Sequence, residues 1–161
     1  MKTANEIVWS GIGQATVQVT PLHMCMISAC VANRGVMQEP ILVRKITTST
    51  GSVTRTGSSR VYRTVLDPFT ADIVADYMEY AVKNGTARQA AVNGCTVCGK
   101  TGTAQVASDG SRNDNAWFTG FIRDAEHPYA IAVVIEEGGA GSNLASRLAS
   151  KVLTQAVKTV G

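Results

Sequence analysis

The chain has 161 residues, of which 45% are hydrophobic and 17% charged, and its net charge is +3. These values describe one globular domain with its own core and exclude a disordered or fibrous chain. The small positive charge gives no reason to expect a nucleic-acid partner. No run approaches the roughly 18 apolar residues of a membrane span, and the first six residues lack the pattern of a signal peptide.

The N-terminal part is predicted to contain one buried helix. Residues 6–20 are expected to form a loop and an extended segment. Thr20 and Pro21 are typical of a helix start, with threonine at the N-cap and proline at the first helical position. Residues 22–32 are apolar nearly all round, which predicts a buried helix, and Gly35 is the expected C-cap glycine.

A basic hairpin is predicted next. Residues 40–47 are expected to form a strand, residues 50–52 a turn, residues 53–55 a return strand and residues 60–63 a second return strand. Between Glu39 and Asp67 the sequence has five basic residues and no acidic one: Arg44, Lys45, Arg55, Arg60 and Arg63. We interpret them as the solvated surface of a hairpin.

Asp67 and Pro68 repeat the pattern of cap residue and proline, and they predict a second helix that ends at Asn84 and Gly85. Its apolar residues recur at helical spacing and form one stripe: Phe69, Ile73, Tyr77 and Tyr80. Residues 86–94 are expected to be a connector.

The second half of the chain predicts three strands and a last helix. The strands are expected around Lys100, at residues 115–122 and at residues 129–136, and their short connections favour an antiparallel meander. A turn is expected at residues 108–111. The last helix should begin with Ser142 or Asn143 as N-cap and line one side with four apolar residues: Leu144, Leu148, Val152 and Ala156. The fold class is therefore α+β, with helices packed on an antiparallel sheet.

Residues 99–105, with the sequence G-K-T-G-T-A-Q, place a cation, two hydroxyls and a glycine on a predicted strand. One interpretation is a phosphate loop, because residues 94–101 fit G-x-x-x-x-G-K-[ST]. A phosphate loop needs a strand before it and a helix directly after it. Neither is predicted here, so the nucleotide interpretation is disfavoured.

Four cysteines include one C-x-x-C pair, Cys95 and Cys98. A zinc site would need a second pair of ligands, and Cys25 and Cys30 are badly spaced for it on a helix. We expect buried free thiols, with no metal and no cofactor.

The second interpretation of residues 99–105 is the K-T-G element of penicillin-recognising acyl-serine enzymes. From about Gly11 to its end, the chain resembles the C-terminal part of the transpeptidase domain of class B penicillin-binding proteins. The resemblance depends on an ordered set of landmarks: G-Q at 13–14, V-T-P-L at 19–22, A-N-R-G at 32–35, N-G-T-A at 84–87, G-K-T-G-T-A at 99–104, A-W-F-T-G-F at 116–121, and the final strand, glycine cluster and helix.

The resemblance implies an incomplete transpeptidase fold of the penicillin-binding-protein and serine β-lactamase type. Residues 1–161 would be its C-terminal portion, and the protein would cross-link peptidoglycan stem peptides ending in D-Ala-D-Ala. Lys100 would supply positive potential and help to move a proton near the nucleophile. Thr101 and Thr103 would bind the carboxylate of a stem peptide or β-lactam, and the Thr103 amide would be an oxyanion donor.

The same resemblance implies that Gly102 and Gly120 keep the strand and its neighbour open. Trp117 would support the cleft, although sheet core is the preferred interpretation for Trp117 and Phe118. The location implied for a parent protein is the extracytoplasmic face of the cell membrane.

The departures from the family pattern concern the nucleophile. The chain contains no S-x-x-K, and its single S-x-N, at residues 111–113, follows K-T-G instead of preceding it. We therefore expect this chain to be inactive alone and to need the remainder of a parent domain. We also expect self-association through the open edge of residues 129–136. The alternative function is a non-catalytic module that binds peptides or β-lactams.

Overall fold

The computed structural model describes residues 3–14, 17–106, 113–124, 126–139 and 144–160. The described helices are α1 (Ala4–Ser10), α2 (Pro21–Ala32), α3 (Pro68–Lys83) and α4 (Leu144–Val160), with a short 3-10 helix η1 (Arg88–Ala90) inside the predicted connector. The described strands are β1 (Val36–Gln38), β2 (Lys45–Thr47), β3 (Val53–Thr56), β4 (Val61–Thr64), β5 (Val97–Ala104), β6 (Asn115–Ile122) and β7 (Ala130–Ile135).

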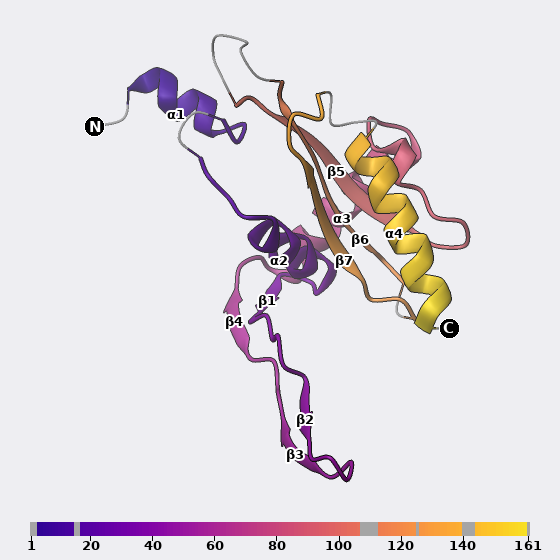
Figure 1. Ribbon diagram of the computed structural model, residues 1–161. Coiled ribbons are helices and arrows are strands. Elements are labelled where there is room, and N and C mark those ends of the chain that lie inside the picture. Colours follow the sequence, from indigo (N-terminus) through magenta and orange to yellow (C-terminus); the bar gives the residue numbers. More distant parts are fainter. Residues whose placement is uncertain (1–2, 15–16, 107–112, 125, 140–143, 161) are drawn as a thin grey trace.

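The body of the molecule is an antiparallel sheet with the strand order β5-β6-β7. In Figure 1 this sheet stands between α4 on one side and α2 with α3 on the other. The predicted meander and the α+β class are therefore confirmed.

Side-chain alternation along the strands produces two cores, one on each face of the sheet. Val97 and Phe118 pack with Ala149 of α4 on the first face. Cys98 is one residue from Val97 and Phe121 is three residues from Phe118, and because both separations are odd, Cys98 and Phe121 pack with α2 and α3 on the other face. The register of β5 against β6 is thereby fixed from both sides.

The basic segment forms a narrow arm that extends away from the body (Figure 1). Its outer part is the β2–β3 hairpin, with the expected turn at Gly51, and its inner part is a β1–β4 pair. The strand predicted over residues 40–47 is too long, because only residues 45–47 pair with a neighbouring strand. Strand β1 was not predicted. All five basic side chains are exposed, as expected.

The predicted loop over residues 6–20 is wrong in its first turns, where α1 forms. Thr3 caps this helix by accepting from the Glu6 amide, and the Glu6 side chain accepts from the Thr3 amide in return. This is the capping box T-x-x-E, which is visible in the sequence.

Helix α2 begins at Pro21 with Thr20 as its N-cap, as predicted. The expectation that it is buried all round is wrong. Its buried residues are Ser28, Cys30 and Val31, whereas Leu22 at the first turn is 56% exposed. Within the described residues, only one face of α2 is buried against the rest of the protein.

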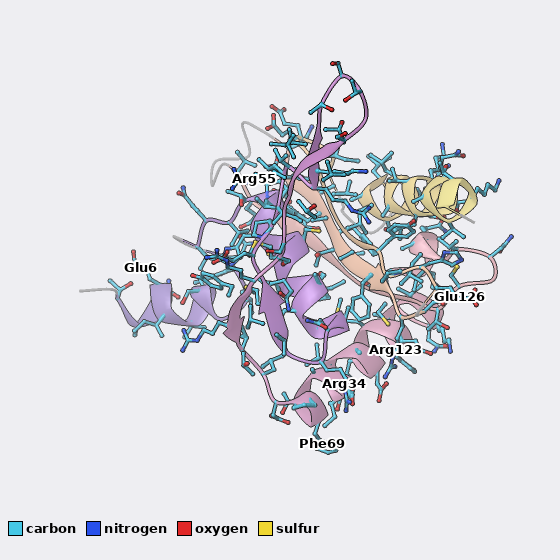
Figure 2. All side chains as sticks on the ribbon, turned by 90° about the horizontal axis from the view of Figure 1, so that it is seen from below. Glu6, Arg34, Arg55, Phe69, Arg123 and Glu126 are labelled. Carbon is cyan, nitrogen blue, oxygen red and sulfur yellow. The ribbon has the colours of Figure 1, made fainter. Side chains whose placement is uncertain are left out.

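The stripes predicted on α3 and α4 are also not the buried faces. On α3 the buried residues are Ala71, Ala75 and Val82, while Phe69, Tyr77 and Tyr80 are 74%, 73% and 66% exposed. Figure 2 shows Phe69 projecting away from the body at the N-terminal end of α3.

On α4 the buried residues are Ala145, Ser146, Ala149 and Leu153, and the predicted stripe of Leu144, Leu148 and Val152 is exposed. In both helices small residues face the sheet, which allows the helix axis to approach it closely. The turn expected at residues 108–111 and the N-cap expected at Ser142 or Asn143 lie outside the described residues.

Ion pairs connect α3 to its neighbours. Arg123, just after β6, contacts Asp76 at 2.5 Å and Glu79 at 3.0 Å, and Arg34 contacts Asp72 at 3.2 Å. Both arginines lie beside α3 in Figure 2. The Arg34–Asp72 pair is exposed and should contribute little to stability, typically about 0 to 1 kcal/mol, whereas Arg123 and Glu79 are only partly exposed.

Gly35 joins the end of α2 to the segment before α3. Its amide donates to the Cys30 carbonyl at 2.8 Å, and its own carbonyl accepts from Val65 at 2.8 Å. Its φ is +91°, and a Cβ there would lie 2.1 Å from the Leu66 carbonyl oxygen. Both the backbone conformation and the space therefore require glycine.

We expect Gly35→Ala to destabilise the fold more than Gly51→Ala. Both glycines have positive φ, which costs an L-residue about 1 to 2 kcal/mol, but nothing lies within 4 Å of a Cβ at Gly51. The clash at Gly35 should add about 1 to 3 kcal/mol. Urea unfolding of both variants measures the difference, and equal losses would contradict it.

Candidate functional site

Strand β5 carries the candidate site and forms one edge of the sheet. Lys100 lies opposite Thr119 of β6, Thr101 opposite Phe118, and Gly102 opposite Trp117. Because opposite residues share a face, Lys100, Gly102 and Trp117 lie on the α2–α3 side. Thr101, Thr103 and Gly120 lie on the α4 side.

The backbone N–H and C=O groups of every second residue of β5 point to the edge of the strand that is not paired with β6. The Thr96 carbonyl accepts from the Arg123 amide at 2.8 Å, so even-numbered residues of β5 direct their backbone groups to β6. Odd-numbered residues, among them Thr101 and Thr103, direct theirs away from β6. The side-chain contacts agree, because Lys100 Nζ donates to the Thr101 carbonyl at 2.5 Å and Gln14 Nε2 donates to the Thr103 carbonyl at 3.0 Å.

Lys100 borders a cavity of about 320 Å³ between the sheet, α2 and α3. Most of the lining is apolar and includes Ile27 of α2 and Met78 of α3. Lys100 itself is exposed at the rim. A charged amine at the mouth of an apolar cavity attracts an anionic group that enters it.

Thr119 of β6, opposite Lys100, connects this strand to α2 through side-chain hydrogen bonds. Its hydroxyl lies 2.5 Å from the Ser28 hydroxyl and donates to the Met24 carbonyl at 3.1 Å. The position of the helix that forms one wall of the cavity is therefore tied to β6. Sequence reasoning missed this contact, since Ser28 and Thr119 are 91 residues apart.

The hydroxyl of Thr101 has a partner outside the motif. Thr101 is only 8% exposed, and its Oγ1 lies 2.9 Å from Thr86 Oγ1 in the connector after α3. Thr86 belongs to the N-G-T-A landmark, and its contact with Thr101 could not be predicted from the motif.

The glycines of the two strands make room for one ring. A Cβ on Gly99 would lie 2.3 Å from Phe118 Cζ, and a Cβ on Gly120 would lie 3.0 Å from the same atom and 2.3 Å from the Cys98 carbonyl oxygen. Gly120 is thus buried under Phe118, on the face away from Lys100. Phe118 is in the core, as preferred above, and Trp117 is half-buried.

The structure contradicts the phosphate-loop interpretation. Residues 97–104 run as one strand through G-K-T-G, so no helix N-terminus follows Lys100 to hold a phosphate. Ser111 of the S-x-N sequence lies outside the described residues.

All four cysteines are among the described residues, and all are free thiols. Cys30 and Cys98 are buried as expected, whereas Cys25 and Cys95 are half-buried. Within the described ranges, no group of three or more His, Cys, Asp or Glu side chains is placed to hold a metal ion. None of the helices described is long and apolar enough to cross a membrane.

Comparison with known proteins identifies the class of this domain. The family model of the penicillin binding protein transpeptidase domain matches residues 2–154. The chain belongs to this family of transpeptidase domains, and the resemblance stated from its motifs is confirmed.

Two relatives show how much of such a domain the chain covers. It is 32% identical over 132 residues to the peptidoglycan D,D-transpeptidase PbpA of Mycolicibacterium smegmatis, covering 81% of this chain and 26% of that protein. It is 34% identical, with a TM-score of 0.79, to the solved D,D-transpeptidase domain of a peptidoglycan glycosyltransferase from Eggerthella lenta, covering 91% of this chain and 34% of the other.

A third comparison involves a drug complex. Penicillin-binding protein A of Mycobacterium tuberculosis, solved as its imipenem acyl-enzyme complex, matches 93% of this chain with a TM-score of 0.80 and 28% identity. This chain covers 33% of that structure. It therefore spans about a quarter to a third of the length of these three proteins.

Cys98, two residues before Lys100 on the same face, gives a prediction of pH dependence. Burial raises the pKa of its thiol to about 12, whereas an unfolded thiol has a pKa of about 8.5. The folded chain keeps this proton above that pH and the unfolded chain loses it. Stability from this group is therefore complete below about pH 8.5 and decreases as the pH rises, by up to about 1.4 kcal/mol per pH unit.

We expect Cys98→Ala to remove this slope while leaving other titrations unchanged. Urea unfolding of both proteins between about pH 8 and about pH 10.5 should show the stability advantage of the unmodified chain shrinking at alkaline pH. A constant difference between the two proteins would show that Cys98 does not titrate in this way.

Proposed function

We propose that this chain is the C-terminal portion of the transpeptidase domain of a peptidoglycan D,D-transpeptidase. The parent protein would cross-link stem peptides ending in D-Ala-D-Ala through an acyl-serine intermediate, would bind β-lactams, and would act at the extracytoplasmic face of the cell membrane. The observation that carries the proposal is β5, whose edge directs the Thr101 and Thr103 backbone away from β6 while Lys100 faces the apolar cavity.

The roles assigned to these groups follow from their chemistry. An extended peptide could add to the edge of β5 through backbone hydrogen bonds. The Thr103 amide would then be an oxyanion donor, and Gly102 would let the peptide backbone approach. Lys100 would supply positive potential and help to move a proton near the nucleophile. Thr101 and Thr103 would bind the terminal carboxylate.

The nucleophile must come from elsewhere, because the sequence contains no S-x-x-K. The remainder of the parent domain would supply it and cover the exposed apolar residues of α3, among them Phe69, Tyr77 and Tyr80. Large apolar side chains that are exposed together are typical of an interface. A cover of this kind would also close the cavity beside Lys100.

We expect the chain alone to form no covalent adduct with benzylpenicillin. Intact-mass measurement should show an unchanged mass, because an acyl-enzyme requires a nucleophile next to Lys100. The same chain joined to a segment with S-x-x-K and S-x-N should gain one benzylpenicillin mass, and Lys100→Met should reduce the rate of that gain. A joined protein that is never acylated would refute the transpeptidase proposal.

The alternative is a non-catalytic module that binds a peptide or a β-lactam at the β5 edge. Such a module would need no S-x-x-K, a sequence that these 161 residues do not contain. In that case, the joined protein would bind benzylpenicillin reversibly without a change of mass.

We further propose that the chain self-associates through β7. The Tyr129 carbonyl accepts from the Ile122 amide at 2.9 Å, which places the backbone groups of Ala130, Ala132 and Val134 on the side away from β6. The strand has no charged residue or proline to discourage pairing. A second copy could pair antiparallel about Ala132, with Ala130 opposite Val134.

Sedimentation velocity at increasing concentration should therefore detect dimers or larger species. Val134→Lys places a charge on this edge and should shift the equilibrium toward monomer. Val53→Lys, on the exposed arm, is the matched control and should leave association unchanged. A monomer at all concentrations, or equal effects of the two variants, would contradict pairing through β7.

A further inference from the structure

Thr86 is held in a fixed position where the chain passes β5. After the last turn of α3, the Gly85 amide and the Ala87 amide both donate to the Ala81 carbonyl, at 3.0 and 3.1 Å. A Cβ on Gly85 would lie 3.0 Å from the Ala81 Cα and carbonyl oxygen, so the turn requires a small residue. Ala87 is fully buried. The backbone on both sides of Thr86 is therefore fixed.

This position brings the Thr86 hydroxyl to the first threonine of K-T-G. The two Oγ1 atoms are 2.9 Å apart, and either one can be the donor. Thr86 is exposed, whereas Thr101 is 8% exposed. Water can therefore reach Thr86 more easily than Thr101, and Thr86 is the hydroxyl that can exchange partners.

The direction of this hydrogen bond decides what Thr101 can do. A threonine hydroxyl has one proton to donate and two lone pairs that accept. If Thr101 donates to Thr86, its proton is used and only its lone pairs face a ligand. If Thr86 donates to Thr101, the Thr101 proton remains for an anionic acceptor, and the chain of two hydrogen bonds strengthens that contact.

We propose that Thr86 is a positioning residue that donates its proton to Thr101 when a carboxylate binds, so that Thr101 donates its own proton to that carboxylate. This inference depends on the carboxylate-binding role that the proposed function gives to Thr101. It assigns to residues 85–87 the task of orienting that hydroxyl from outside the K-T-G strand.

Two substitutions separate this role from simple packing. Thr86→Val keeps the shape of the side chain and removes the hydroxyl, while Thr86→Ser keeps the hydroxyl. Thr64→Val, on the exposed strand β4, is a control for the general effect of replacing a strand threonine. Thermal unfolding of each variant establishes that the fold is retained.

The test is an NMR titration of the 161-residue chain itself, following the Thr101 and Thr103 amides. The ligands are D-alanyl-D-alanine and its C-terminal amide, which lacks the carboxylate. We expect the acid to shift both amides in the unmodified chain, in Thr86→Ser and in Thr64→Val. In Thr86→Val its dissociation constant should rise by up to about tenfold, because the neutral hydrogen bond that orients the Thr101 hydroxyl is lost.

Three results would overturn the inference: no shift with the acid in the unmodified chain, equal affinities in Thr86→Val and the unmodified chain, or equal weakening by Thr86→Val of acid and amide binding. The last would indicate that Thr86 only holds the connector against β5. None of these readings needs acylation, so a failure of the transpeptidase proposal in the joined protein is a separate result.

Discussion

The register of β5 against β6 is the constraint on which the rest of the site depends. Packing of Val97 on one face and Cys98 on the other fixes it. A slip of one residue would turn every side chain of β5 to the opposite face, so that Lys100 would point into the α4 core. The same slip would turn the backbone groups of Thr101 and Thr103 toward β6. Two hydrophobic cores thus determine where a cation and an open strand edge are presented.

Close packing in these cores is achieved with residues that have little or no side chain. Gly99 and Gly120 leave the volume that the Phe118 ring fills, and Ala149 allows α4 to approach the same strands. Such an interior tolerates little added volume. Packing therefore explains glycine at positions of the A-W-F-T-G-F and G-K-T-G stretches, in addition to any role with a substrate. Gly120 in particular makes room for Phe118 in the core.

Local chemistry predicted the elements well and their buried faces poorly. Thr20 with Pro21 and Asp67 with Pro68 mark helix starts because side-chain oxygen and ring geometry act within one turn. The Thr3–Glu6 capping box was an equally local signal that the loop prediction overlooked. Contacts within the site could not be predicted in this way. Thr86 and Thr101 are 15 residues apart, and Gln14 and Thr103 are 89 residues apart, so only the folded chain brings them together.

The helical stripes were misassigned for a reason that bears on the proposed function. Apolar spacing indicates that a helix face is buried, but it does not identify the surface that covers it. On α3 and α4 the alanine-rich faces pack on the sheet, and the larger apolar stripes that include Tyr77 and Leu148 stay exposed. Helices with one small-residue face and one large apolar face are suited to a position between two layers. In the proposed parent domain, the remainder of the domain would supply that second layer, since this chain spans about a third of its structural relatives.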